Sequence, residues 1–253
     1  MWRLIVFFIT MLAVMPVGAE DIKLVADKQV EYHQKEQKLV AVGNAIASKG
    51  NVSIRGDRLV GYYAPELPNK ISRVEATGNV AITSAQAKAW GNKATYDVKE
   101  ATAVLMGGPA RVKTAEADIT AKGSITFWQD KQQALAKDGV TATNKNGNKV
   151  QADQMRAYFT KDKSGKLVLE KIDINGNVKI NAKETEITAA KGTYQALNGK
   201  IELFDDITIK QNGNVLHGKK AETNLNTGIS RIISGPQGRV SGVFKETKKE
   251  KDK

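Results

Sequence analysis

The stretch VEATGNVAIT (residues 74–83) and its near copy IDINGNVKIN (residues 172–181) decide the fold of this chain. On both sides of each Gly-Asn pair, apolar residues recur at every second position. Side chains at i and i+2 share one face of a strand, so each stretch has one dry face. One dry face and one wet face are typical of antiparallel sheets. The same alternation at residues 22–26, 52–55 and 207–210 predicts an all-β fold.

Two markers repeat along the chain at a spacing of about thirty residues, which is the signature of a repeat architecture. The first marker is an anchor residue at Tyr32, Tyr62, Tyr96, Phe127, Tyr158, Tyr194 and Leu225. The second is a turn phrase at Gly43-Asn44, Gly78-Asn79, Gly107-Gly108, Asp138-Gly139, Gly176-Asn177, Asp205-Asp206 and Gly235-Pro236. Together they predict about seven repeats of roughly 30 residues, stacked in one elongated domain over residues 20–244.

Local signals favour hairpins over helices. Asn-Gly pairs, which tolerate the positive φ of two-residue hairpin turns, occur at residues 146–147, 175–176, 198–199 and 212–213. No stretch sustains helical periodicity, and we interpret the Ala-rich segments 85–89 and 131–136 as strand. Small residues are frequent at inward positions, among them Ala41, Ala45, Ala47, Ala85, Ala87 and Ala89. They suit either a thin closed sandwich or a groove left partly unfilled.

The two ends of the chain differ from its middle. Residues 1–19 combine Arg3, a short apolar run from Leu4 to Met15 and a small-residue site at 17–19, which predicts a secretory signal peptide. The alternative is that this run is retained as a membrane anchor. The tail, residues 245–253, is charged and almost free of apolar residues, so we expect it to be disordered.

Composition restricts the chemistry that the chain can perform. It has no cysteine, which excludes disulfides, thiolate metal sites and a cysteine nucleophile. Its formal net charge is +12. For an exported chain, a basic surface favours an anionic glycan or a lipid headgroup as partner over nucleic acid.

Few residues are candidates for catalysis. The two histidines, His33 and His217, lie far apart and have no zinc-binding spacing, so we expect both to be solvated. The adjacent pair Asp205-Asp206 could act in glycoside chemistry, but its place among the turn phrases favours a bend. The recurring carboxylates Asp27, Asp57, Asp97, Asp118 and Asp153 are expected to hydrogen-bond local turns. We therefore predict no catalytic residue, no metal site and no cofactor.

The repeated tyrosines allow two interpretations. They could form a stacking ladder for sugars or bases. Alternatively, they cap the sheet edge of each repeat and stack on one another, which equal spacing would produce. The second interpretation is the one that we favour.

Several phrases carry a resemblance to a known family. These are residues 22–27 (IKLVAD), 42–44 (VGN), 50–59 (GNVSIRGDRL), 74–80 (VEATGNV) and 172–178 (IDINGNV). They resemble the OstA/LptA family, the periplasmic proteins of lipopolysaccharide transport. The chain departs from the family in its greater length, and the phrase GGPARV at residues 107–112 lacks the Asn.

The resemblance implies an elongated V-shaped β-jellyroll of stacked antiparallel strands, with open sheet edges and no covalent chemistry. Implied partners are lipopolysaccharide through its lipid A, the inner- and outer-membrane transport components through sheet edges, and further copies of the chain joined end to end. The apolar residues after each turn would then line a groove for acyl chains, namely Ile54, Val80, Ile82, Val178, Ile180, Ile207 and Ile209. Two alternatives remain open: a membrane-anchored inner-membrane member of the same transport system, and a secreted β-solenoid that binds or cleaves polysaccharide.

Overall fold

The computed structural model describes residues 21–65, 67–163, 165–224, 230–234 and 239–243. The regular structure of these residues is a single antiparallel sheet of 18 strands, so the all-β prediction is confirmed. The strands are β1 (Lys23–Val25), β2 (Gln29–His33), β3 (Lys38–Lys49), β4 (Val52–Ala64), β5 (Leu67–Thr83), β6 (Ala87–Asp97), β7 (Thr102–Met106), β8 (Ala110–Thr114), β9 (Ala117–Ala121), β10 (Ser124–Trp128), β11 (Gln133–Asn144), β12 (Lys149–Lys161), β13 (Leu167–Ala182), β14 (Thr185–Gln195), β15 (Lys200–Gln211), β16 (Asn214–Asn224), β17 (Ser230–Ile233) and β18 (Ser241–Val243).

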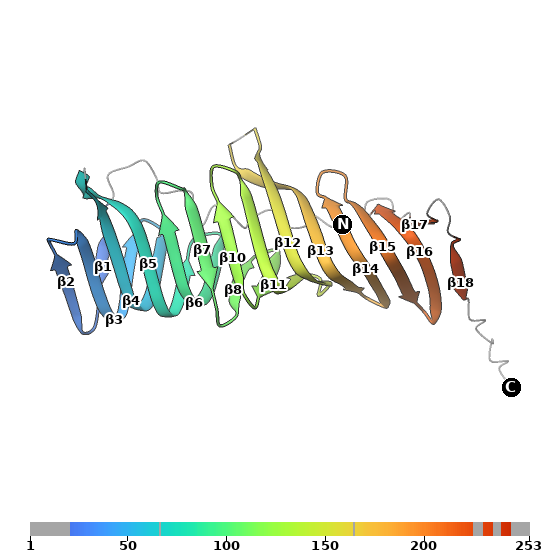
Figure 1. The fold of residues 1–253 in the computed structure, drawn as a ribbon, viewed down its shortest axis with the longest axis horizontal. Helices are drawn as coiled ribbons and strands as arrows, with labels where there is room; N and C mark the ends of the chain where they lie inside the picture. Colours follow the sequence, from blue (N-terminus) through green and yellow to red (C-terminus); the bar gives the residue numbers. More distant parts are fainter. Residues whose placement is uncertain (1–20, 66, 164, 225–229, 235–238, 244–253) are drawn as a thin grey trace.

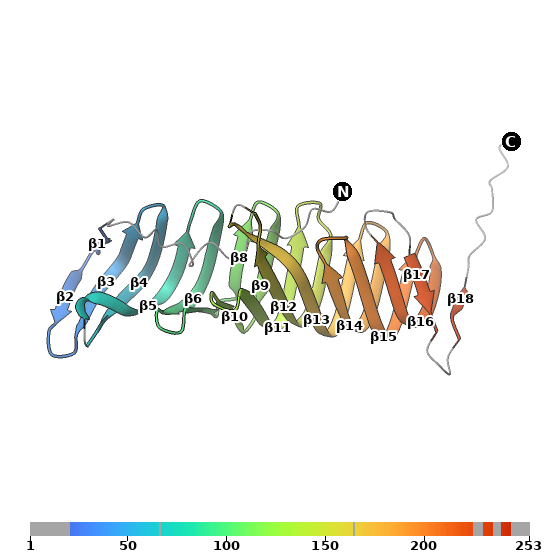
Figure 2. The ribbon, with the colours of Figure 1, turned by 90° about the horizontal axis from the view of Figure 1, so that it is seen from above.

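The molecule is long and narrow, with its strands running across the long axis (Figures 1 and 2). Strands β1 and β2 lie at one end, and β17 and β18 lie at the other. Nearly every strand pairs with its neighbour in the chain, because the connections are short hairpins. Within the described residues there is no helix long and apolar enough to cross a membrane. The predicted signal peptide and the predicted tail lie outside the described residues.

Each long strand bends halfway along its length. The register of strand pairing shifts at this point, for example between Thr77 and Val80 in β5 and between Asn175 and Val178 in β13. Four short strands each correspond to half of a long strand, because β7 and β8 both pair with β6, and β9 and β10 both pair with β11. We call these midpoints the corners.

The predicted turn phrases are these corners: five lie within a long strand, and the phrase at 107–108 joins β7 to β8. Both residues of the phrases at 43–44, 78–79, 107–108, 138–139, 176–177 and 205–206 have positive φ. Two consecutive residues of this kind form a bulge, which redirects the strand without ending it. The turn prediction was wrong because a hairpin and a bulge need the same residue types. The phrase at 235–236 lies outside the described residues.

The Asn-Gly pairs gave a better guide to the hairpins. Residues 146–147, 198–199 and 212–213 lie in the connections β11–β12, β14–β15 and β15–β16. The pair at 175–176 was wrongly assigned, since it belongs to the corner of β13. Each of the segments 85–89 and 131–136 begins with two bend or turn residues and continues as a strand. The prediction that both segments are strand is therefore confirmed in part.

The corners divide the sheet into two layers that enclose one core. The anchor layer contains β2, β7, β10 and β17 with the adjoining halves of the long strands, and the second layer contains β1, β8, β9 and β18 with the other halves. Buried apolar side chains of both layers belong to one continuous cluster. Leu59 and Leu203 enter it from the anchor layer, and Val80 and Ile207 enter it from the second layer. The apolar faces predicted from the alternation therefore face each other.

The chain contains two similar halves, residues 37–114 and 132–211. Strands β3, β4 and β6 have 12, 13 and 11 residues, and their counterparts β11, β12 and β14 have the same lengths. Tyr63 N–H donates to the Gln37 carbonyl at 2.8 Å, and Phe159 N–H donates to the Gln132 carbonyl at 2.9 Å. Gln37 and Gln132 both have positive φ. The halves thus share details of backbone geometry as well as strand order.

The anchor residues do not share one face. Tyr96, Phe127 and Tyr194 pack in or against the core. Tyr62 and Tyr158 lie on the outer face, and a register shift immediately follows each of them. Within the described residues, the one tyrosine–tyrosine contact is Tyr32 with Tyr63, at a centroid distance of 6.1 Å. Equal spacing in sequence therefore does not produce a continuous aromatic stack.

Candidate functional site

The seven predicted groove residues all face the interior between the two layers. Val80, Ile82, Val178, Ile180 and Ile207 are between 1% and 4% exposed, and Ile54 and Ile209 pack against the same cluster from partly buried positions. The polar residues between them, such as Ser53 and Lys179, point outward because successive strand residues alternate between faces. Their contact with lipid remains a prediction.

Carboxylates and asparagines hold the corners together. The Asn44 side-chain amide donates to Asp27 at 2.7 Å, and the Asn177 amide donates to Asp153 at 2.9 Å. In the same way, Asn79 donates to both oxygens of Asp57 at 3.0 and 3.2 Å. These carboxylates therefore bind to the corner of the neighbouring strand, and not to a local turn as predicted.

The remaining recurring carboxylates have other partners. Asp97 accepts a hydrogen bond from the backbone N–H of Glu100 in the following turn, as predicted. Asp118 instead accepts two hydrogen bonds from Arg111 on the neighbouring strand. The pair Asp205-Asp206 forms the corner of β15, where it is held by Lys191 at 3.2 Å and Lys219 at 3.1 Å.

Neither histidine belongs to a metal-binding group. His33 Nε2 lies 2.6 Å from a Glu31 carboxylate oxygen, and His217 Nδ1 lies 3.1 Å from the Thr208 hydroxyl. Among the described residues, no group of three or more potential metal ligands gathers at one place.

Outer-face tyrosines are covered by cations at equivalent places in the two halves. The Arg73 guanidinium lies 4.3 Å from the Tyr62 ring centroid, and the Lys171 ammonium lies 4.3 Å from that of Tyr158. Arg73 also pairs with Glu75 at 3.2 Å, and Lys171 pairs with Asp173 at 3.1 Å. Burial, together with the hydrogen bond to Asp173, raises the pKa of the Tyr158 hydroxyl.

Exposed apolar side chains gather at the two ends of the sheet. Val25, Val30 and Tyr32 at the β1–β2 end are 63%, 50% and 57% exposed. Val243 at the β17–β18 end is 66% exposed. Since a terminal strand also presents unpaired backbone groups, both ends have the features of a surface that pairs with another strand.

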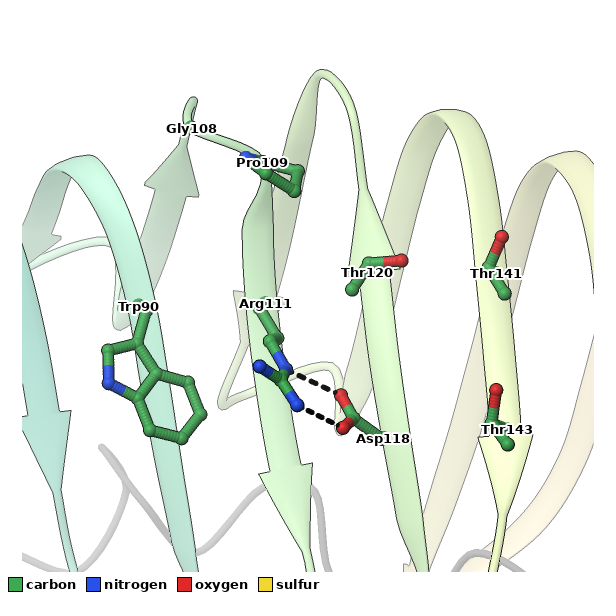
Figure 3. A pocket seen from close by; sticks show the side chains of 8 residues that line it. All are labelled: Trp90, Gly108, Pro109, Arg111, Asp118, Thr120, Thr141 and Thr143. Carbon is green, nitrogen blue, oxygen red and sulfur yellow. Dashed lines mark hydrogen bonds and ion pairs between the residues drawn. The ribbon is translucent and has the colours of Figure 1, made fainter. Parts of the chain in front are cut away.

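A hollow of about 600 Å³ lies on the outer face of the second layer, which the sequence did not indicate (Figure 3). Its lining comes from β6, β8, β9, β11 and the corner between β7 and β8, namely Trp90, Gly108, Pro109, Arg111, Asp118, Thr120, Thr141 and Thr143. Arg111 and Asp118 form a two-fold hydrogen bond across the hollow's centre, at 2.8 and 2.5 Å. This bond holds the pKa of the Asp118 carboxyl below its ordinary value.

The sequence matches one protein family twice. The family is described as LptA/(LptD N-terminal domain) LPS transport protein, and the matches cover residues 23–133 and 118–229. The chain belongs to this family. Its membership confirms the predicted family and the prediction of a lipopolysaccharide transport protein instead of an enzyme. The overlap of the two matches falls on β9 and β10, where the sheet continues without interruption.

Other comparisons add little. Among solved structures, one match is LptH from Pseudomonas aeruginosa, described as the LptA homologous periplasmic component of the lipopolysaccharide transport device. It is 12% identical, the match covers 90% of this chain and 96% of LptH, and the TM-score is 0.22. No curated protein matches the sequence. The family assignment rests on the two sequence matches.

Proposed function

We propose that this protein carries lipopolysaccharide with its acyl chains between the two layers, and bridges membrane components without performing any reaction. The observation that supports this most strongly is the continuous apolar cluster that both layers enclose along the molecule. Acyl chains require an environment from which water is excluded, and burial of each CH₂ group contributes about 0.8 kcal/mol. The groove residues of the proposal are the seven interior residues predicted above, and it needs no cofactor.

The two layers would separate along the side opposite the corners, where only hairpins end each strand. A V-shaped cross-section built from about seven repeats belongs to this proposal. The family membership and the net charge of +12 support lipid A as the ligand, because its phosphates favour a basic rim. The proposal also places the protein in the periplasm, with the segment 1–19 acting as a cleaved signal peptide.

The ends of the sheet would bind the neighbouring components. Exposed apolar residues and unpaired strand edges at β1–β2 and β17–β18 support addition of a partner's strand. The partners would be the inner-membrane and outer-membrane transport components, or another copy of the chain. If the segment 1–19 were retained, the chain would be a membrane-anchored member of the same system. Mass spectrometry of the exported protein decides this, since a mature chain that begins at Glu20 excludes the anchor.

Photo-crosslinking tests the interior site. A photoreactive amino acid in place of Ile82 or Ile180 should capture lipopolysaccharide in cells, because both side chains face the core. The same amino acid in place of Ser53 or Lys179, which face outward on neighbouring positions, provides the control. Capture at the outward positions alone would overturn the proposal.

The two halves should differ in this experiment. Interior alanines Ala76, Ala89, Ala103 and Ala110 of the first half have isoleucines as counterparts in the second half, at positions 174, 187, 201 and 207. Separating the layers costs free energy in proportion to the apolar area exposed, so the half lined by alanine opens more easily. We therefore expect stronger capture at Ile82 than at Ile180.

A further inference from the structure

We propose that the outer-face hollow around Trp90, Arg111 and Asp118 binds a short oligosaccharide, separately from the acyl chains in the interior. The proposal rests on the proposed function only in naming the sugar part of lipopolysaccharide as the source of that ligand. The hollow lies on the face of the second layer opposite the core. A ligand there would leave the seven groove residues untouched.

Strand register brings the lining residues together. Trp90, Arg111, Thr120 and Thr141 are directly cross-strand from one another on β6, β8, β9 and β11. A second row runs parallel to the first, from Lys88 through Lys113, Asp118 and Thr143 to Lys149. Figure 3 shows the side chains of Trp90, the ion pair and the three threonines following one another across adjacent strands.

Differences in side-chain length produce the hollow. Thr120, Thr141 and Thr143 are short, whereas the bulky Trp90 and Arg111 stand beside them. The corner at Gly108 and Pro109 limits the hollow along the strands. Its volume of about 600 Å³ falls within the range of small-ligand sites.

The lining combines the groups that recognise a sugar. Trp90 is partly exposed, and its indole offers an apolar surface to the C–H groups of a pyranose. Arg111 is held in a fixed orientation by Asp118, which leaves its other N–H groups and the remaining carboxylate lone pairs for ligand hydroxyls. The hydroxyls of Thr120, Thr141 and Thr143 have no hydrogen-bond partner among the described residues, so they too can bind a ligand.

The charge of the hollow favours sugars over a simple anion. Asp118 neutralises Arg111, so the centre of the hollow is a mixture of donors and acceptors. Lys88 and Lys149 in the second row form no ion pair among the described residues, whereas Lys113 lies directly across from Asp118 and helps to lower its pKa. These lysines would favour an oligosaccharide that also carries phosphate or carboxylate groups.

The repeat itself does not require these residues. At the equivalent places in the second half, Thr188, Thr208 and His217 follow one another across β14, β15 and β16. The fold is therefore built equally well with a small hydroxyl residue in place of Trp90 and Arg111. Their presence in one half alone indicates a function of the surface and not a need of the sheet.

Binding of lipid-free oligosaccharide to the full mature chain tests the proposal. The probe is the oligosaccharide released from lipopolysaccharide by mild acid, and lipid A without the oligosaccharide serves as the interior probe. Titration calorimetry should show binding to the wild type, at least tenfold weaker binding to Trp90→Ala and Asp118→Asn, and partial recovery in Trp90→Phe. Thr188→Ala, which changes the counterpart of Trp90, is the matched control and should bind like the wild type.

The two probes separate the failure of one proposal from the failure of the other. Lipid A should bind equally to the wild type and to all four variants, because none of the altered residues faces the interior. No oligosaccharide binding to the wild type, or equal binding to Trp90→Ala, would overturn the outer-face site while leaving the interior site in place. Absence of lipid A binding would overturn the interior site alone. Dephosphorylated oligosaccharide measures the contribution of the lysines, and it should bind more weakly than the intact probe.

Discussion

The two halves of the molecule share a backbone plan and differ on both faces of their sheet. Each has a Gly-Asn corner held by an aspartate, at residues 78–79 with Asp57 and at 176–177 with Asp153. Inside, four alanines of the first half have isoleucines as their counterparts in the second. Outside, Trp90 and Arg111 of the first half line the hollow, and their counterparts in the second half are Thr188 and Thr208. The comparison shows that corners and hairpins determine the fold, whereas the side chains on the inner and outer faces can differ between the halves.

The largest expected effect concerns the interior of the second half. Ile207 is 1% exposed, so Ile207→Ala removes fully buried methyl groups and leaves a cavity. We expect a loss of about 3–4 kcal/mol in the free energy of unfolding, measured by urea denaturation. Leu197→Ala is the control, since that side chain is 97% exposed in a turn and should contribute almost nothing.

The reciprocal change tests the first half. Its counterpart Ala110 is 0% exposed, so Ala110→Ile should destabilise by about 1–3 kcal/mol through overpacking if the layers are closely packed there. A stability equal to that of the wild type would show that the first half already contains unfilled space. That result would assign the groove to the first half.

The corners should give an effect of similar size, and an equal one in both halves. A Cβ on Gly78 or Gly176 would lie 2.1 or 2.2 Å from a carboxylate oxygen, and both glycines have positive φ. We expect Gly78→Ala and Gly176→Ala each to lower the free energy of unfolding by about 2–3 kcal/mol, partly from the φ strain of 1–2 kcal/mol. Gly147→Ala isolates that strain, because its φ is +79° and no heavy atom lies within 4 Å of the added Cβ.

Unequal losses at Gly78 and Gly176 would contradict the view that the corners are equivalent. If Gly78→Ala and Gly176→Ala each cost no more free energy than Gly147→Ala, then Asp57 and Asp153 move aside to accept the added Cβ. Denaturation of all three variants in one experiment separates these outcomes.

The corners also show where reasoning from sequence succeeded and where it ended. The alternation after Asn79 and Asn177 correctly placed Val80, Ile82, Val178 and Ile180 on the inner face, because strand periodicity is local. The Gly-Asn phrase was misread as a turn, since positive φ suits both a hairpin and a bulge, and only the strand pairing on both sides tells them apart.

The outer-face hollow could not be found from the sequence, for a related reason. Trp90, Arg111 and Thr141 are separated by 20 or more positions in the chain, and strand register alone makes them neighbours. The assignment of Asp118 to a turn was wrong on the same ground, because its partner Arg111 lies across a strand pair. The signal that could have been used is the contrast between Trp90 and its counterpart Thr188, but pairing these positions requires knowledge of the duplication.

A smaller and symmetrical effect is expected from the cations over the outer tyrosines. Arg73→Gln and Lys171→Gln each remove a cation over a ring and one surface ion pair, so each should cost about 0.5–1 kcal/mol. Lys99→Gln, at an exposed turn position, controls for the change in net charge. High salt should reduce both losses, because these are exposed electrostatic contacts. A loss of stability from only one of the two substitutions would show that the tyrosine–cation contacts of the two halves are not equivalent.

The smallest expected effect belongs to the ion pair between Arg111 of the first half and Asp118 on β9. Its hydrogen bond to Arg111 lowers the pKa of Asp118 below the ordinary value of 3.8, so the pair stabilises the folded chain above that value. The stabilisation is lost as the pH falls through the lowered pKa, and for a pair this exposed it amounts to about 0.2–1 kcal/mol. Because the Trp90 indole lies beside the Arg111 guanidinium, its N–H resonance should titrate with a midpoint below pH 3.8. Asp118→Asn should abolish that titration, whereas Thr188→Ala in the second half should leave it unchanged; a midpoint at the ordinary value would show that the pair does not form in solution.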